Sequence, residues 1–270
     1  MAITTSRQGF LDELVKNRDR ANDSAVRCLT WNIQNSSLQR ATRQVKWLQK
    51  NDFDIIVLTE AKLSDGCAYI KDRLTSLGYV TIFPKPENND YSQILAVRKF
   101  FKEAPKIPVD FLPYRVSSAV CNFFGKYVLV VGSYMPIWKD EKKVTFLKSF
   151  QKLIQDENLR KKFDNWIILG DMNVLEPNHN PAHPLYEKYE FFYNSFSENG
   201  FRDAFRFFYP NNQEYSWFSR EKSGYRFDHI FISENFLPLV KNCFYIHETR
   251  LEKLSDHSAM CLEISGPTGI

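Results

Sequence analysis

The stretch "NWIILGDMNVLEPNHNPAHP", residues 165–184, decides how the fold of this chain is interpreted. It begins with an apolar run that ends in a glycine, and this pattern predicts a short buried strand over residues 165–170. Asp171 and Asn173 follow directly, and alternate residues on extended backbone point to the same side. The stretch therefore predicts a strand that delivers a carboxylate and an amide to one common site.

Further apolar runs, rich in β-branched and aromatic residues, predict additional strands along the chain. They cover residues 26–31, 54–59, 78–83, 92–98, 126–134, 226–233 and 257–264. Helical patterns lie between some of them, at residues 37–50, 66–77, 143–156 and 185–199. Because helices alternate with strands in places and strand follows strand elsewhere, the sequence predicts mixed sheets with helices packed outside them.

The chain of 270 residues contains no glycine-rich or serine-rich linker, no repeat and no low-complexity segment. We therefore expect a single domain over residues 25–266. An amphipathic pattern at residues 6–20, with Ser6 as a possible cap, predicts a helix within an N-terminal extension of residues 1–24.

The composition is that of an ordinary globular protein, with 43% hydrophobic and 25% charged residues. A net charge of +4 permits a phosphate-bearing partner. No apolar run approaches the roughly 18 residues of a membrane span, and the N-terminus has no secretory pattern, so we expect a cytoplasmic protein without a membrane partner. The five cysteines include no C-x-x-C pair, which favours reduced thiols over zinc ligands. Nothing in the surface pattern points to a dimer, so we expect a monomer.

Polar side chains recur at the ends of the predicted strands. Asn32, Glu60, Tyr134, Asp171 and Asn173 follow or close their strands, whereas Asp228 and His257 stand at or near the start of theirs. A single acid after a strand is usually a turn or cap residue, so the repetition is the informative feature. If the last two strands run antiparallel to the others, these positions meet along one edge of the sheets, where ligand sites tend to lie.

The residue types at these positions fit a phosphoryl site. Glu60 offers a hard oxygen ligand, which suits magnesium or manganese better than zinc. Asp171 could accept a proton from a water molecule, while Asn173 could position that water or hold a developing oxyanion. Asp228 could orient His257 through one ring nitrogen, and a protonated His257 would stabilise negative charge on a phosphate.

Six segments of the sequence resemble the endonuclease/exonuclease/phosphatase family in their order and spacing, and resemble most its exonuclease III and apurinic endonuclease branch. They are "LTWNIQN", "DIIVLTEAK", "VVGSYMP", "ILGDMNV", "YSWFSREKSGYRFDHIFIS" and "LSDHSAM", and Tyr91-Ser92 matches a further strand of that branch. The resemblance covers roughly residues 25–266. It implies a four-layer α/β sandwich, two mixed sheets face to face with helices outside, and metal-dependent hydrolysis of a phosphoester.

The resemblance also implies roles for single residues. Asp171 would activate the attacking water, Asn173 would help bind the phosphate, and Tyr134 would touch the phosphate or lie beside the leaving group. Asp228 would orient His257, which would stabilise the pentacovalent phosphorus.

The implied cofactor is Mg²⁺ or Mn²⁺. By the same resemblance, Glu60 would bind the ion, Asn32 would support it, and Asp256 would lie near it.

Two stretches, 201–210 and 215–229, interleave Arg and Lys with aromatic residues. Such mixtures can stack on bases and neutralise phosphates, or they can form core aromatics with a charged edge, and the sequence leaves both readings open. For a nucleic-acid substrate, the residues we expect to bind it are Trp217, Arg220, Tyr225 and Arg226.

Departures from the family pattern fall in segments expected to contact substrate. The first Asn is followed by Gln34-Asn35-Ser36-Ser37 where the repair branch has a "GLRA" pattern, and Tyr225 stands where that branch often has Trp. The segment 175–194 has no counterpart in the repair enzymes. The catalytic positions are retained, whereas the preference for abasic sites is left open.

The segment 175–194 contains two histidines, His179 and His183, at a spacing that would place both on one helix face. Three prolines, at positions 177, 181 and 184, argue against a helix there, so we expect a loop over the site with no metal role. His229 and His247 are expected to be structural.

Three functions remain open from the sequence. The preferred one is a magnesium-dependent DNA nuclease of the abasic-endonuclease or exonuclease kind. The second is a phosphodiesterase or phosphatase acting on RNA, nucleotides or another small phosphoester, since one fold hosts many functions. The third is an inactive binding module, against which the full set of polar residues argues.

Overall fold

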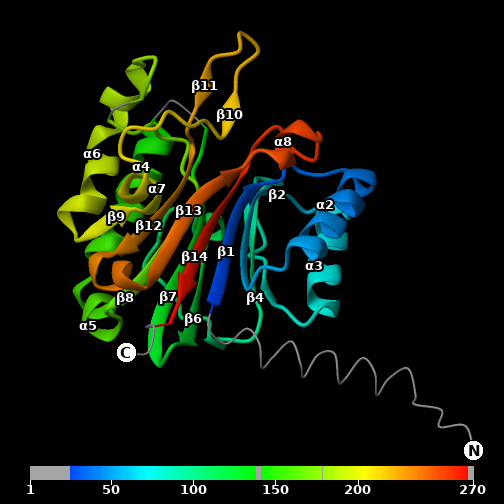
Figure 1. Ribbon diagram of the computed structural model, residues 1–270, viewed down its shortest axis with the longest axis horizontal. Coiled ribbons are helices and arrows are strands. Elements are labelled where there is room, and N and C mark those ends of the chain that lie inside the picture. The colour runs from blue at the N-terminus through cyan, green and yellow to red at the C-terminus, as the bar shows by residue number, and fades with distance from the viewer. Residues whose placement is uncertain (1–24, 138–140, 178, 267–270) are drawn as a thin grey trace, which may run out of the picture.

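The computed structural model describes residues 25–137, 141–177 and 179–266, so the helix predicted at 6–20 lies outside the described residues. The described strands form two six-stranded sheets and a separate two-stranded hairpin. Helices flank the pair of sheets on both sides (Figure 1).

The first sheet has the strand order β13-β14-β1-β2-β4-β3. Its strands are β1 (Ala25–Asn32), β2 (Ile55–Ala61), β3 (Val80–Ile82), β4 (Ser92–Val97), β13 (Val240–Ile246) and β14 (Ala259–Ser265). The second sheet has the order β5-β6-β7-β8-β12-β9. Its strands are β5 (Phe101–Glu103), β6 (Val116–Phe123), β7 (Lys126–Tyr134), β8 (Asn165–Asp171), β9 (Phe201–Asp203) and β12 (Asp228–Ser233). The hairpin consists of β10 (Trp217–Phe218) and β11 (Gly224–Tyr225).

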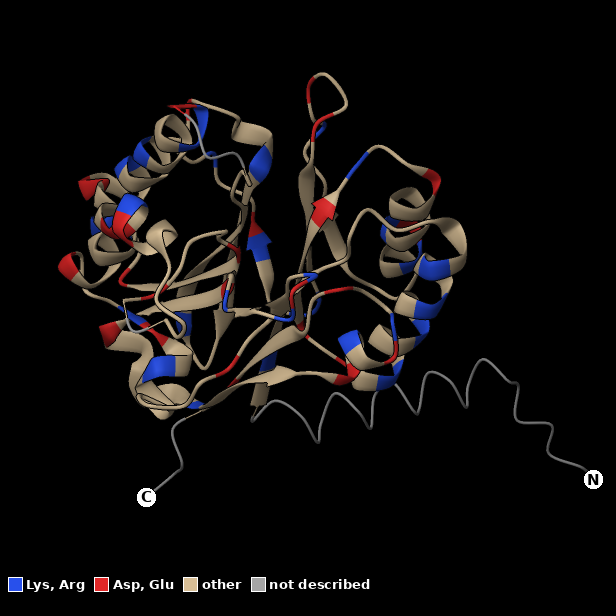
Figure 2. Ribbon diagram, turned by 90° about the horizontal axis from the view of Figure 1, so that it is seen from above, with Lys and Arg blue, Asp and Glu red and all other residues tan. Residues whose placement is uncertain are grey.

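The described helices are α2 (Leu38–Asn51), α3 (Asp65–Ser76), α4 (Glu141–Gln155), α5 (Glu157–Lys162), α6 (Pro184–Glu198), α7 (Ala204–Phe208) and α8 (Glu248–Leu251), with 3₁₀ turns η1 (Pro113–Arg115) and η2 (Glu234–Leu239). Helices α2, α3, α4 and α6 pack on the outer faces of the sheets, whereas α7 contributes Ala204 and Phe205 to the core between them. Figure 2 shows the charged residues concentrated on the helices, while the strands between them carry few. No described helix combines the length and apolarity needed to cross a membrane.

Alternation along the strands builds three separate cores. In β8, Ile167 and Leu169 face the core between the two sheets, while Trp166 and Ile168 face the outer core beneath α4 and α6. A third core lies between the first sheet and helices α2 and α3. A strand that is buried on both faces carries apolar residues at successive positions, which explains the continuous apolar run of β8. The predicted four-layer α/β sandwich is confirmed.

Local signals explain where the main helices begin. Ser37 caps α2, its side chain accepting a hydrogen bond from the backbone N–H of Arg40. In α6, Pro184 occupies the first turn, where a missing N–H costs nothing. All four predicted helices are present with bounds shifted by about two residues or fewer.

Strand directions bring the predicted polar positions to one edge. β1 is parallel to β2, and β7 is parallel to β8, so these four strands end at the same side. β12 runs antiparallel to β8, and β14 runs antiparallel to β1, so these two begin there. Gly170 allows β7 and β8 to approach, because a Cβ at this position would lie 1.8 Å from the carbonyl oxygen of Ser133. The antiparallel arrangement that the sequence required is therefore confirmed.

Candidate active site

Asp171 lies at the centre of a group of polar side chains contributed by both sheets. In the sheet register it stands beside Tyr134 of β7 on one side and Asp228 of β12 on the other. Asn32 of the first sheet donates from Nδ2 to Asp171 Oδ2 at 2.8 Å, and the backbone N–H of Asn173 donates to Asp171 Oδ1 at 3.0 Å. The carboxylate is thus oriented on both oxygens by groups from two sheets.

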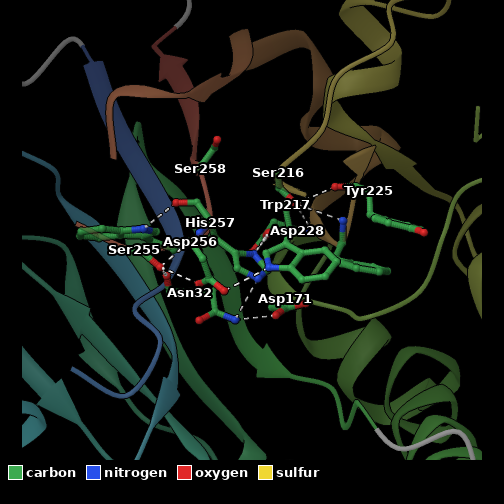
Figure 3. Close-up of polar contacts among 12 residues, drawn as sticks. Asn32, Asp171, Ser216, Trp217, Tyr225, Asp228, Ser255, Asp256, His257 and Ser258 are labelled. Carbon is green, nitrogen blue, oxygen red and sulfur yellow. Dashed lines mark hydrogen bonds and ion pairs between the residues drawn. The ribbon is translucent and has the colours of Figure 1, made fainter. Parts of the chain in front are cut away.

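A histidine–carboxylate pair lies next to it (Figure 3). His257 Nδ1 is 2.8 Å from Asp228 Oδ2, and the Asp228 side chain is fully buried. Burial alone would lower the pKa of His257, but the carboxylates of Asp228 and Asp171 outweigh it and raise the pKa to about 10. The neighbouring carboxylates therefore favour the protonated, positively charged form of His257.

The pKa of Asp171 is raised to about 8. Burial is the largest cause, followed by the negative charge of Asp228, while His257 and a hydrogen bond from Asn32 act in the opposite direction and Glu60 adds to the rise. Carboxylates crowded in this way favour a bound cation, which would relieve their repulsion.

Glu60 and Asp256 complete the acidic side of the site. Glu60 has a φ of 55°, a left-handed conformation that is uncommon for a non-glycine residue, and it accepts a hydrogen bond from Tyr134 Oη at 3.1 Å. Tyr134 is only 1% exposed, so its position supports a role in holding Glu60, and its direct contact with a phosphate stays a prediction. Asp256 accepts a hydrogen bond from Trp217 Nε1 at 3.1 Å.

The donor atoms of this site fit a metal ion. One ligand atom each from Asp171, Asp228 and His257 lies within 4.8 Å of the others, a grouping that could bind a metal. This group differs from the ligand set predicted from the sequence, in which Glu60 was the main ligand. Since His257 and Asp228 already bind each other, the carboxylates of Glu60 and Asp256, which line the pocket, are the more accessible hard donors.

These groups open into a pocket of about 360 Å³. Its polar side consists of Glu60, Asp171, Asn173, Asp256 and His257. The rest of its lining is largely apolar and aromatic, formed by Ile137, His183, Leu185, Trp217, Tyr225 and Phe227 together with Lys143 and Ser219. A mostly apolar cleft with a few convergent polar groups is the usual form of a ligand site.

Residues 29–257 match the family model of the endonuclease/exonuclease/phosphatase family. The chain belongs to this family. It is a hydrolase that acts on phosphodiester bonds. The resemblance inferred from the six sequence segments is confirmed.

Relatives within the family support this assignment. An exodeoxyribonuclease of Bacillus subtilis (strain 168) is 24% identical over 237 residues, which cover 78% of this chain and 89% of the relative. A Neisseria 3′ phosphatase solved with its product DNA hairpin shares the fold, with a TM-score of 0.73, 23% identity and coverage of 89% of this chain and 99% of that one. An AP endonuclease from Archaeoglobus fulgidus gives a TM-score of 0.71 at 21% identity, covering 88% of this chain and 98% of that one.

Arg226, one of the residues that we expected to bind substrate, does not line the pocket. Arg226 is fully buried, and its Nη2 lies 2.7 Å from Glu176 Oε2 and 2.6 Å from Asp203 Oδ2. Arg206 also pairs with Glu176. The prediction that Arg226 binds substrate is therefore wrong, because buried carboxylates already use its charge. Arg226 instead ties the start of β12 to the segment that follows Asp171.

The other three predicted substrate-binding residues surround the hairpin. Trp217 and Tyr225 line the pocket, whereas Arg220 is exposed in the turn between β10 and β11 and does not line it. Their contacts with substrate stay predictions. The two stretches that mix basic and aromatic residues therefore contain both buried and exposed side chains. Phe205 and Arg226 are buried, whereas Arg220 is exposed.

The remaining histidines have structural partners, as the sequence suggested for two of them. His229 is fully buried and lies between Asp203 Oδ2 at 3.2 Å and the carbonyl oxygen of Val174 at 3.1 Å. His247 contacts Ser258 Oγ at 2.9 Å and Glu214 Oε2 at 2.8 Å.

The segment with His179 and His183 is not helical where it is described, and α6 begins only at Pro184. His183 lines the pocket. The expected loop is present at residues 175–177 and 179–183, whereas residues 184–194 belong to α6.

Two residues of the site were missed from the sequence. Lys143 is 1% exposed, lines the pocket and donates to the carbonyl oxygen of Asn173 at 2.6 Å. Ser216 is fully buried, and its Oγ accepts hydrogen bonds from the backbone N–H groups of Phe227 at 3.1 Å and Asp228 at 3.3 Å. Ser216 lies within one of the six segments that resemble the family, so the sequence did indicate this position. Lys143 lies in a run of charged residues, and nothing in the sequence distinguishes it from its neighbours.

Proposed function

We propose that the chain is a magnesium-dependent nuclease that cleaves the DNA backbone, as an abasic-site endonuclease or as an exonuclease. The observation that carries this proposal is the buried set of Asn32, Asp171, Asp228 and His257, which is assembled across both sheets and of which Asp171 and His257 line the pocket. These groups combine a proton acceptor with a fixed positive charge, the two elements that phosphodiester hydrolysis requires.

Mg²⁺, or Mn²⁺ in its place, would be held by Glu60 with support from Asn32 and Asp256. When bound, the ion supplies positive charge that stabilises a phosphate oxygen and favours the ionised form of nearby carboxylates. The hard oxygen donors on the polar side of the pocket support this assignment.

The protein's own residues would carry out the proton transfer and the charge stabilisation. Asp171, oriented by Asn32 and by the backbone of Asn173, would accept the proton of the attacking water. His257, kept protonated by Asp228, would donate a charged hydrogen bond to an oxygen of the pentacovalent phosphorane. Asn173 lines the pocket and would contact the phosphate.

DNA is the preferred substrate because of the relatives and the pocket wall. One relative is named as an exodeoxyribonuclease, and another was solved with a DNA hairpin product. Trp217 and Tyr225 supply aromatic faces beside the catalytic groups, and such faces bind exposed nucleotide units by stacking.

A second function is supported by the size of the pocket. A space of about 360 Å³ accommodates a small unit better than a continuous duplex. Phosphodiesterase or phosphatase activity on RNA, nucleotides or another small phosphoester would use the same catalytic groups.

We further propose that the protein works as a monomer in the cytosol. All five cysteines are free and buried in the structure, in agreement with the expected reduced thiols.

A substrate panel tests the proposed function. It contains a duplex with one abasic site, an intact duplex, single-stranded DNA, RNA and bis-p-nitrophenyl phosphate, each incubated with Mg²⁺, Mn²⁺ or EDTA. We expect cleavage of DNA with either metal and none with EDTA. Cleavage of only RNA or of the small diester would support the second function, and cleavage that persists in EDTA would contradict the metal assignment.

A further inference from the structure

His183 is a polar residue of the pocket to which the proposed mechanism gives no role. It is half-buried at the N-terminus of α6, where its Nδ1 accepts a hydrogen bond from the backbone N–H of Leu185 at 3.1 Å. The same side chain lines the pocket that holds the catalytic groups. Its ring therefore joins the helix cap on one side to the substrate space on the other.

The capping contact determines which ring nitrogen carries the proton. A nitrogen that accepts from a backbone N–H must present its lone pair, so the proton of the neutral ring resides on Nε2. Among the described residues, no hydrogen bond to His183 Nε2 is found. The pocket wall thus offers one N–H donor with a fixed orientation.

The surrounding contacts hold this donor in place. The His183 ring packs edge-on against Tyr225, with ring centroids 5.6 Å apart and an interplanar angle of 85°. His179 stacks on Tyr225 as well, at 5.5 Å and 18°, and Tyr215 Oη donates to the carbonyl oxygen of Asn180 at 2.7 Å. The segment that bears His183 is therefore attached to the hairpin that forms the pocket wall, and the donor is preorganised.

Three neighbours of His183 in the pocket do not supply the same donor. Leu185 and Phe227 are apolar, and the N–H of Trp217 is already donated to Asp256. An oriented donor in a largely apolar wall discriminates between ligands, because a ligand without an acceptor leaves the donor unpaired on binding.

We propose that His183 is a specificity-determining residue, which donates its Nε2–H to an acceptor on the nucleoside unit attached to the scissile phosphate. This inference rests on the proposed phosphodiesterase function and names the part of the substrate that His183 recognises. The acceptor is an oxygen or ring nitrogen of a base, or an oxygen of a sugar, and both sources share this chemistry.

The test compares substrates with and without a nucleoside. His183→Ser keeps a good helix-capping side chain but removes the pocket donor, and Glu187→Ser, an exposed position in the same helical turn, is the matched control. We expect His183→Ser to lower kcat/KM on a DNA oligonucleotide about tenfold, the loss typical of one hydrogen bond, with most of the change in KM. Its kcat/KM on bis-p-nitrophenyl phosphate should stay within about twofold of wild type, and Glu187→Ser should change neither.

The outcomes separate this inference from the function on which it rests. An equal loss on both substrates, or no loss on the oligonucleotide, would overturn the role of His183 while leaving the phosphodiesterase intact. A wild-type protein inactive on both substrates would overturn the proposed function and this inference with it. An oligonucleotide with a tetrahydrofuran abasic unit at the cleaved position identifies the source of the acceptor. A retained effect of His183→Ser supports the sugar, and a lost effect supports the base.

Discussion

At the scale of the residue, the pair formed by Asp228 and His257 determines the charge at the site. A neutral amide in place of the carboxylate would leave burial as the main influence, so the pKa of His257 would fall from about 10. We expect Asp228→Asn to lower kcat about 100-fold or more, because the uncharged ring no longer stabilises the phosphorane.

Kinetics and an NMR titration of the His257 ring test this prediction. Glu214→Gln is the matched control, since it removes the carboxylate partner of another histidine, His247, at a more exposed position. That variant should retain activity within about twofold of wild type. A wild-type rate in Asp228→Asn would show that the pair does not act in catalysis.

Single residues also show the limit of sequence reasoning. Asp171 and Asn173 were found because they directly follow an apolar strand, and the strand ends do meet. Arg226 was misassigned because its neighbours in sequence suggest a basic aromatic surface, whereas its partners Glu176 and Asp203 are distant in the chain. Burial of a charge depends on such distant partners, and a sequence pattern does not contain them.

At the scale of the element, predicted strands were reliable where they were long and apolar. β6 was missed because "VSSAVCNF" contains three polar residues, although it lies in the middle of its sheet and is almost entirely buried. β13 was missed for a similar reason, and β5, β9, β10 and β11 are only two or three residues long. Their pairing is decided by neighbouring strands, which local propensity does not describe.

The buried ion-pair cluster connects several elements and should affect acid stability. Burial alone would raise the pKa of Glu176, but Arg226 and Arg206 lower it to about 2 from 4.5. A lower pKa in the folded state means that the unfolded chain binds the proton more readily, so stability is lost as the pH falls from about 4.5 towards about 2. The full contribution is present above that window, and it amounts to about 3 kcal/mol.

Urea unfolding at about pH 7 and about pH 3 measures this effect. Glu176→Gln should be less stable than wild type at neutral pH, and its stability should depend less on pH across the acid range. Parallel pH profiles for the two proteins would contradict the assignment of the buried pair.

The β10–β11 hairpin carries the predicted nucleic-acid contact that remains exposed, Arg220. If it contacts a phosphate, Arg220→Ala should weaken binding of all DNA sequences alike and reduce the slope of log K against log salt by about one. Fluorescence anisotropy in EDTA measures binding without cleavage. The control is Arg202→Ala. Arg202 lies on β9, an edge strand of the second sheet, and its side chain pairs with Glu234. An unchanged salt slope in Arg220→Ala would place the DNA elsewhere.

At the scale of the whole molecule, the active site exists only because two sheets meet. Asn32 and His257 come from the first sheet, and Asp171 and Asp228 come from the second. Each sheet alone holds half of the catalytic groups, so the packing of the central core positions the chemistry. The sequence could predict which residues gather at the edge, but not the hydrogen bonds that link the two sheets.

The central claim is that this cross-sheet centre hydrolyses phosphodiesters with Asp171 as the proton acceptor. The most direct measurement is the single-turnover cleavage rate of Asp171→Asn in Mg²⁺, with thermal unfolding recorded alongside. We predict a rate lowered about 1,000-fold or more in a protein that still unfolds cooperatively, since Asn has nearly the same size and shape as Asp but cannot accept the proton. A folded variant that cleaves within about tenfold of wild type would contradict the account.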